Sequence, residues 1–177
     1  MIQLFTELQE KKNVRSNLSA LRASLKEATE EQKVQAIEFV RGHEDLVFGF
    51  LQEEDAKTRK NAALLLGDLA VQNALQPLWK AYTREQTLFV KSAYLEAMKA
   101  LHAEEILSQL KDRLAELEGE PVTEEKRKHR EAELRALRAI LIQYEGIDTH
   151  HFDIKQKNNH VLLVTNRNHR GILENQT

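Results

Sequence analysis

Two stretches of the sequence decide the fold: TRKNAALLLGDLAVQNALQPL over residues 58–78 and VKSAYLEAMKALHAEEILSQL over residues 90–110. Their apolar positions match at a constant offset of 32 residues, since 58 pairs with 90 and 78 pairs with 110. In each stretch one apolar set recurs at helical spacing, a short break follows, and a second set begins. This pattern predicts a helix, a turn and an antiparallel helix, repeated. One such pair cannot bury its apolar face alone, so we expect the copies to stack into a solenoid.

The repeated unit resembles the HEAT repeat. That motif has a basic residue near the start of its first helix, a small residue near the middle of that helix and paired leucines in the second helix. The first copy has Arg59 and Ala62 at these places and ends in Leu75 and Leu78. The second copy departs from the motif with Tyr94, where a small residue is usual. The two copies cover about a third of the chain, and the motif indicates a fold rather than a function.

The resemblance implies an all-α fold: a right-handed solenoid of antiparallel helix pairs. Arg59 and Lys91 hold the basic position of the repeat. In proteins with this motif, that residue braces neighbouring repeats by pairing with an aspartate of the turn, here Asp55. We therefore expect a structural role for both cations rather than a binding role.

Cap signals divide the chain into further helices. An N-cap side chain accepts a hydrogen bond from a backbone N–H of the first turn, and serine, threonine, aspartate and asparagine are preferred there. The expected N-caps are Ser16, Thr29, Asp55, Asn73, Thr83 and Thr123.

The composition changes after Gly146, so we divide the chain into a helical repeat domain over residues 1–146 and a tail over residues 147–177. In the tail, Phe152 and Ile154 alternate with polar residues, and a β-branched run follows the turn signal Asn158-Asn159. This pattern predicts a short β-hairpin. Because an isolated hairpin is marginally stable, the tail either packs on the helices or begins a second domain, and we favour the second interpretation.

The bulk composition excludes several function classes. A chain of 177 residues without cysteine has no disulfide, no thiolate nucleophile and no cysteine-ligated metal. The net charge of −2 exerts no bulk attraction on nucleic acid or anionic membranes. No apolar run approaches the length of a membrane span and no signal peptide opens the chain, so we expect a cytoplasmic protein with no membrane contact.

The sequence carries no catalytic or cofactor-binding motif. Its six glycines are isolated, which excludes a phosphate-binding loop or a dinucleotide loop in this chain, and no His-Glu-x-x-His motif occurs. We therefore expect no catalytic residue and no cofactor. The densest polar set has metal-ligand chemistry, but solvated linker residues are the favoured explanation; it comprises Asp148, His150, His151, Asp153, His160 and His169.

The candidate partner-binding residues are cations on expected helices. Some lie on the second helices of the repeats, which usually line the concave surface of a HEAT-like array. Others form a basic run in the long charged helix after Thr123, where interleaved glutamates favour ordinary ion pairs over phosphate contacts. The candidates are Lys80, Lys111, Arg113, Lys126, Arg127, Lys128 and Arg130.

The leading hypothesis is a non-catalytic interaction scaffold that presents a concave helical surface to a protein or structured RNA partner. The tail, from Phe152 through the run at residues 160–167 to Leu173, resembles the entry segment of bacterial methyltransferases that join a HEAT-like region to an S-adenosylmethionine-dependent domain acting on RNA. That resemblance implies that this chain is the accessory part of such an enzyme.

The alternative is a self-contained HEAT-like DNA-binding or base-excision repair enzyme, with Trp79, Tyr82 and Asp112 as a loose match to its carboxylate and aromatics. Such an enzyme needs a strongly basic groove, which the net charge disfavours. The oligomeric state is left open by the sequence.

Overall fold

The computed structural model describes residues 1–145, and all regular structure in this range is helical, which confirms the all-α prediction there. The chain divides into two compact units, residues 1–103 and 104–177, which we describe separately. The β-hairpin predicted within 147–177 lies outside the described residues. Within residues 1–145, no helix combines the length and the apolar composition that crossing a bilayer requires.

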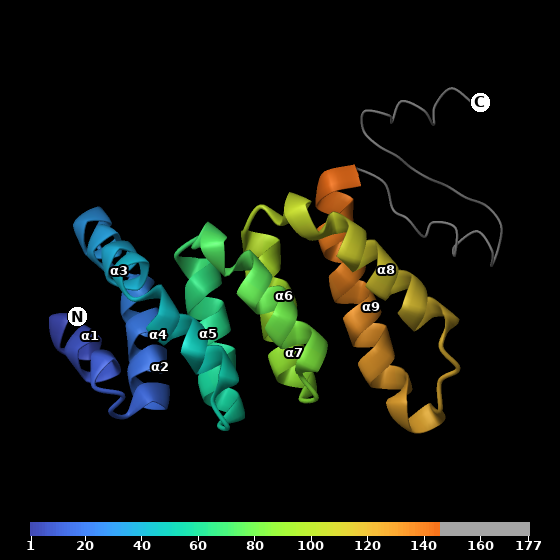
Figure 1. Cartoon of the computed structure of the whole chain (residues 1–177), viewed down its shortest axis with the longest axis horizontal. Helices are drawn as coiled ribbons and strands as arrows, with labels where there is room; N and C mark the ends of the chain where they lie inside the picture. The colour runs from blue at the N-terminus through green and yellow to red at the C-terminus, as the bar shows by residue number, and fades with distance from the viewer. Residues whose placement is uncertain (146–177) are drawn as a thin grey trace. The chain divides into compact units, whose positions relative to one another are not determined.

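The first unit contains helices α1 to α7 and two short 3₁₀ helices, η1 and η2. Helix α5 packs against both α2 and α7, so these three helices lie side by side, while α6 packs against α7 and η1 (Figure 1). The elements are α1 (Ile2–Gln9), α2 (Val14–Leu25), α3 (Glu30–Gly42), α4 (Glu44–Gly49), η1 (Phe50–Gln52), α5 (Ala56–Asp68), η2 (Gln72–Ala74), α6 (Leu75–Arg84) and α7 (Leu88–Ala100).

Helices α5 and α7 approach each other closely at Gly67. A Cβ atom added to Gly67 would lie 2.9 Å from the Cα atom of Ala97, so these helices meet backbone to backbone at this point. Leu66, Leu78 and Met98, all repeat positions, are fully buried in the same unit. The repeat pattern therefore identified true core positions.

The turns that follow α5 and α7 are joined by one side chain. The Gln72 amide donates to the carbonyl oxygen of His102 at 2.8 Å, and its own oxygen accepts from the backbone N–H of His102 at 2.9 Å. This pair of bonds fixes the end of α7 to the loop that begins α6.

The predicted N-caps Thr29 and Asp55 are confirmed, and both bond to residues only three positions away. Thr29 accepts from the backbone N–H of Gln32 in a complete capping box, and Asp55 accepts from the backbone N–H of Thr58 at 2.8 Å. Helix α9 begins directly after Thr123, as predicted.

Three predicted caps are wrong. Ser16 lies inside α2, which begins at Val14 after Asn13 in the left-handed conformation. Asn73 lies in η2 and donates to the Glu44 carboxylate instead. Thr83 lies in the last turn of α6, where its hydroxyl donates to the carbonyl oxygen of Lys80 at 2.8 Å. In the last two cases, the side chain that was expected to cap a helix has another partner.

The described part of the second unit is a helical hairpin that follows the 3₁₀ helix η3 (Ala103–Ile106), which begins one residue before the unit boundary. Helices α8 (Leu107–Gly119) and α9 (Glu124–Glu145) pack against each other. Their buried seam consists of Leu110, Leu114, Leu117, Leu134, Leu137, Ile140 and Leu141. The apolar stripes of two amphipathic helices thus face each other across the hairpin.

Candidate functional site

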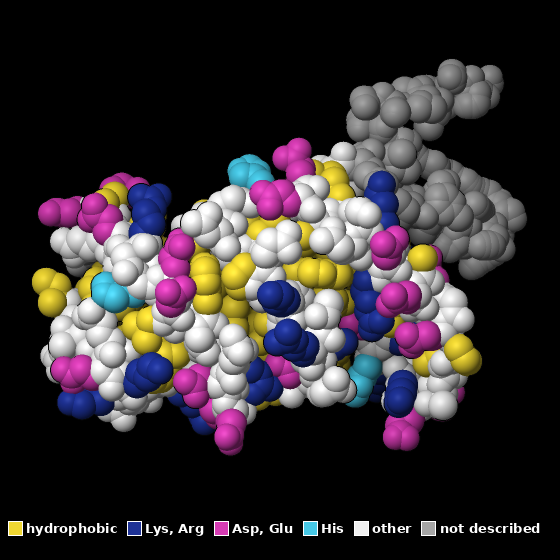
Figure 2. Space-filling view, in the orientation of Figure 1, with side chains coloured by type: hydrophobic (Ala, Val, Ile, Leu, Met, Phe, Trp, Pro, Cys, Tyr) yellow, Lys and Arg dark blue, Asp and Glu magenta, His cyan; other side chains and the backbone are white. Residues whose placement is uncertain are grey.

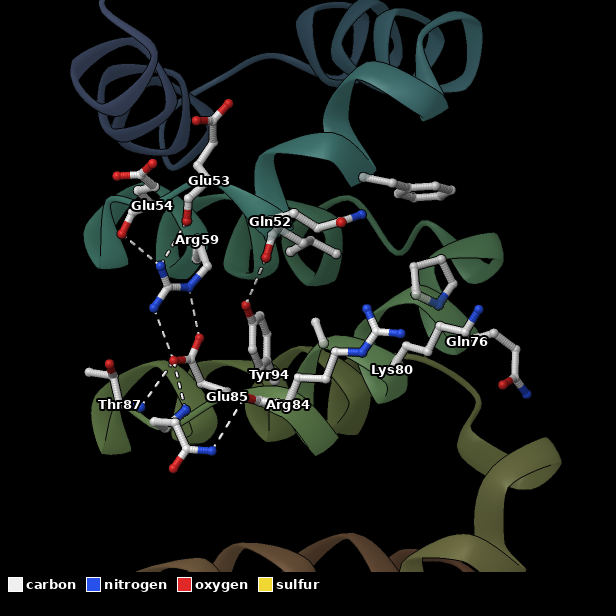
Figure 3. A pocket seen from close by; sticks show the side chains of 15 residues that line it. Gln52, Glu53, Glu54, Arg59, Gln76, Lys80, Arg84, Glu85, Thr87 and Tyr94 are labelled. Carbon is white, nitrogen blue, oxygen red and sulfur yellow. Dashed lines mark hydrogen bonds and ion pairs between the residues drawn. The ribbon is translucent and has the colours of Figure 1, made fainter.

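A groove of about 810 Å³ lies within the first unit between the α4–η1 segment and α6. Phe48 and Leu51 of the α4–η1 segment and Pro77 of α6 are among its lining residues. Figure 3 shows Gln52 on one side of the groove and Gln76 and Lys80 of α6 on the other. Tyr94 of α7 lies at the base and donates from its hydroxyl to the carbonyl oxygen of Leu51 at 3.3 Å. The groove therefore spans consecutive helix pairs.

The base of the groove is held by an ion pair between Arg59 and Glu85. The Arg59 Nε atom donates to Glu85 Oε2 at 2.8 Å, and Nη2 donates to Oε1 at 3.0 Å. The Nη1 atom donates to the backbone carbonyls of Glu53 and Glu54 at 2.7 and 2.8 Å. One guanidinium thus connects α5, the turn before it and the turn between α6 and α7, and its planar fork suits this bidentate geometry.

Glu85 remains ionised although its side chain is only 5% exposed. Burial favours the protonated form, but the Arg59 guanidinium and the backbone N–H groups of Thr87 and Gln86 outweigh it, so the pKa of Glu85 is lowered. Burial raises the pKa of the neighbouring Tyr94 hydroxyl well above its usual range, so that group stays a neutral donor. The base of the groove is therefore pre-organised.

Helix α6 presents a row of long side chains to the groove. Gln76, Lys80 and Arg84 follow one another at intervals of four residues, which places them on one face of a helix (Figure 3). Pro77 is tolerated because it lies in the first turn, where its missing N–H would have no partner within the helix. Lys80 and Arg84 are exposed, and neither forms an ion pair with any side chain of the described residues.

The charges that line the groove balance. Three basic and three acidic residues line the groove, and two of them, Arg59 and Glu85, pair with each other. Lys80 and Arg84 supply the remaining positive charge on α6, and Glu53 and Glu54 supply the negative charge on the opposite side. Figure 2 shows cationic side chains in dark blue over α6, beside yellow apolar surface. The groove therefore offers apolar contact and both signs of charge.

The predicted partner of Arg59 was wrong. Asp55 pairs with Arg15 at 3.5 Å and caps α5, and the Arg59 guanidinium turns to Glu85 instead. Glu85 lies 26 residues away in the sequence, so no local spacing indicated it. Lys91, the equivalent of Arg59 in the second copy, places its ammonium 5.2 Å from the ring centroid of Tyr82. Arg59 therefore has the predicted structural role, but its partner is Glu85 rather than Asp55.

Of the predicted partner-binding residues, only Lys80 lines this groove, and the other six lie in the second unit. Arg113 of α8 pairs with Glu116 at 3.1 Å and with Glu133 of α9 at 3.3 Å, and Lys111 is an exposed residue of the same helix. Lys80 was predicted from its position on a second helix, and it does line the groove. Arg84 also lines the groove and was not predicted, although it lies four residues after Lys80 in the sequence.

The basic run at the start of α9 is partly used in ordinary ion pairs. Arg127 pairs with Glu124 one turn away, and Arg130 donates to the carbonyl oxygens of Leu117 and Glu118 at 2.6 and 3.1 Å. Those carbonyls belong to the end of α8, so Arg130 caps that helix. Lys126 and Lys128 remain exposed on the same turns.

Within residues 1–145, no group of three or more histidine, aspartate or glutamate side chains is arranged to hold a metal ion. The polar set around His150 and the tail that resembles a methyltransferase segment lie outside the described residues. No family model, curated protein or solved structure matches this chain. A function must therefore be inferred from the described geometry.

Proposed function

We propose that this chain is a non-catalytic scaffold in which stacked helix pairs form a HEAT-like array and the groove between η1 and α6 binds an extended segment of a partner protein. Two features support the array: the matching of residues 58–78 to residues 90–110, and the row formed by α2, α5 and α7 with α6 and η1 packed beside it. Repeat arrays of this kind use the surface formed by their second helices for binding.

The charge balance of the groove carries the choice of a protein partner. A nucleic-acid backbone is a uniform polyanion, and its binding needs cations in excess. Here Glu53 and Glu54 offset Lys80 and Arg84, while Phe48, Leu51 and Pro77 supply apolar contact. A polypeptide segment with apolar anchors and charges of both signs complements such a surface.

The rigidity of the base favours binding. Arg59, Glu85 and Tyr94 are already held by one another and by the adjoining backbone, so binding a ligand costs no conformational entropy to order them. The exposed cations on α6 are free to pair with acidic residues of the partner. Because such rim pairs contribute only about 1 kcal/mol or less each, we expect Lys80 and Arg84 to select the partner and the apolar wall to hold it.

A peptide selection on the full chain tests this proposal. We would select from random linear peptides displayed on phage and measure each enriched peptide by fluorescence anisotropy against the native chain and a Lys80→Glu/Arg84→Glu variant. We expect binding to weaken by about tenfold or more, because two attractive charges become repulsive. The control is Lys126→Glu/Lys128→Glu, which makes the same change of net charge on exposed residues of α9.

Two results would overturn the proposal. One is that no peptide is enriched, or that enriched peptides bind the Lys80→Glu/Arg84→Glu variant as tightly as the native chain. The other is that a stem–loop RNA binds and loses affinity with this variant but not with the control. That result would make the groove an RNA-binding surface.

The rival repair-enzyme hypothesis gains no support from the site geometry. The ring centroids of Trp79 and the buried Tyr82 lie 5.3 Å apart, and Asp112 is an exposed residue of the second unit. The accessory role in an RNA methyltransferase stays a prediction, because the residues that suggest it follow residue 145.

A further inference from the structure

A second groove, of about 380 Å³, lies in the first unit between α2 and α5. Its lining differs in kind from that of the η1–α6 groove. Three side chains are basic, three are neutral hydrogen-bonding groups and none is acidic: Arg15, Ser16, Ser19, Lys57, Lys60 and Asn61. None of these six residues lines the η1–α6 groove, and the repeat pattern does not explain why cations gather here.

Both helices turn one polar face toward this groove. Lys57, Lys60 and Asn61 lie three and four residues apart on α5, which places them on one face, and Arg15 and Ser19 have the same relation on α2. An ion pair of 2.6 Å between Arg22 and Asp68 joins the same two helices farther along. The cations are thus presented by a fixed helix pair rather than by loops.

The Asp55 carboxylate, at the start of α5, is already engaged. Asp55 Oδ2 accepts from both the backbone N–H and the hydroxyl of Thr58 at 2.8 Å, while Oδ1 lies 3.5 Å from Arg15. That pair offsets part of the charge of Arg15. Lys57 and Lys60 form no ion pair with a side chain of the described residues. The groove therefore keeps an excess of positive charge on a chain whose net charge is −2.

We propose that the α2–α5 groove binds the phosphodiester backbone of a nucleic acid. Cations in excess supply the attraction, and the serine hydroxyls and the Asn61 amide donate hydrogen bonds to phosphate oxygens without adding charge. The cations are spread over an open groove instead of converging on one buried point, which suits successive phosphates of a polymer. No aromatic residue lines the groove, so contact would be sequence-independent.

An anionic membrane fits this surface less well. Membrane-surface binding adds apolar insertion to charge attraction, and the exposed large apolar residues of the first unit, Ile2, Val34 and Phe89, do not line the groove. The nucleic-acid proposal does not depend on the proposed function of the η1–α6 groove, since the two linings share no residue.

The test uses the full chain and two labelled probes, a stem–loop RNA and a duplex DNA of equal length, titrated over a range of potassium chloride concentrations. We expect Lys57→Glu/Lys60→Glu to raise the Kd by about tenfold or more, because both attractive charges are reversed. Lys57→Gln/Lys60→Gln should lower the slope of log Kd against log salt by about two, one for each lost phosphate contact. The preferred probe identifies the kind of nucleic acid.

Lys126→Glu/Lys128→Glu is the matched control, and we expect it to change the Kd by less than about twofold. Unchanged circular dichroism and melting of each variant would exclude unfolding as the cause of a loss. The proposal is overturned if neither probe binds at low salt, if the α9 control loses as much affinity as the α2–α5 variant, or if vesicles with anionic headgroups bind while both nucleic acids do not.

Discussion

The two helix junctions that the structure describes in most detail are built in different ways. In the first unit, α5 and α7 approach until backbone meets backbone at Gly67 and Ala97, and one buried pair, Arg59 with Glu85, fixes the adjoining turns. In the second unit, α8 and α9 pack mainly through leucines. Arg113 pairs there with the buried Glu133, and Arg138 pairs with the partly exposed Glu118. The first junction combines a close backbone approach with a bidentate ion pair, whereas the second combines side-chain packing with pairs that include the partly exposed Arg138–Glu118 contact.

This difference predicts how each junction responds to change. A close-packed contact has no room for added atoms, and a buried ion pair cannot lose one partner without leaving the other uncompensated. Partly exposed pairs are screened by salt and contribute little individually. The sole tryptophan, Trp79, lies in α6, so its fluorescence reports unfolding of the first unit.

The largest effect is expected for Arg59→Met. The substitution keeps much of the side-chain volume but leaves the Glu85 carboxylate buried without its guanidinium, so we expect the free energy of unfolding to fall by about 3 kcal/mol. Urea unfolding followed by Trp79 fluorescence measures it. Lys91→Met at the equivalent position removes an ammonium group that lies 5.2 Å from the Tyr82 ring centroid, and we expect a cost of about 1 kcal/mol or less. Equal losses from both variants would contradict the distinction.

The next effect is expected for Gly67→Ala. An added methyl group would meet the Ala97 backbone at 2.9 Å, so α5 and α7 must move apart, at a cost of about 2 kcal/mol by the same measurement. Gly49→Ala is the control, because a Cβ at Gly49 meets nothing within 4 Å and should be neutral or stabilising. A stabilising Gly67→Ala variant would show that the helices do not approach this closely.

A smaller effect is expected from pH. The pKa of Glu85 is lower in the folded state than in the unfolded chain, so its ionised form stabilises the fold above the unfolded pKa of about 4.3. That stability is lost as the pH falls through the folded pKa. We therefore expect the difference in unfolding free energy between the native chain and Glu85→Gln to shrink below about pH 4. If the difference in unfolding free energy stayed constant down to about pH 2, ionisation of Glu85 would not be the cause of it.

The smallest effect is expected in the α8–α9 hairpin. Arg138 pairs with Glu118 at 2.6 Å, but its Nε atom is buried without a hydrogen-bond partner, so part of the gain is offset. Arg138→Met should change the stability of the hairpin by less than about 1 kcal/mol. Amide hydrogen exchange in α8 and α9 would measure this change, and raising the sodium chloride concentration should reduce it. A loss as large as that of Arg59→Met would contradict the contrast between the two junctions.

The sequence predicted those parts of the fold whose signals are local or periodic. The buried positions Leu66, Leu78 and Met98 followed from a repeat, and Thr29 and Asp55 cap their helices with partners within three residues. Asn73 and Thr83 failed as caps because a partner 29 residues away, Glu44, holds Asn73, and because α6 continues through Thr83. Local propensity yields to tertiary contacts in such places.

The candidate site was predicted only in part, and for the same reason. Lys80 was found from its place on a second helix, but the groove also needs η1, and the link from Arg59 to Glu85 spans 26 residues. The α2–α5 groove brings Arg15 of α2 together with Lys57 and Lys60 of α5. No spacing in the sequence indicates that these two helices are neighbours. Periodicity identifies which residues are buried, whereas surfaces depend on which helices become neighbours.

The side chain of Gln72 behaves like a peptide group, since its N–H donates to the carbonyl oxygen of His102 and its oxygen accepts from the N–H of His102. Only an uncharged carboxamide of that length can do both, because a carboxylate has no proton to give. At the offset of 32 residues that relates the two sequence copies, the counterpart of Gln72 is Glu104, whose ionised carboxylate cannot donate a hydrogen bond. The first compact unit ends at the residue just before it, Ala103. If the proposed array were extended by another copy of these turns, that copy would need a glutamine at the place of Gln72 to form both hydrogen bonds.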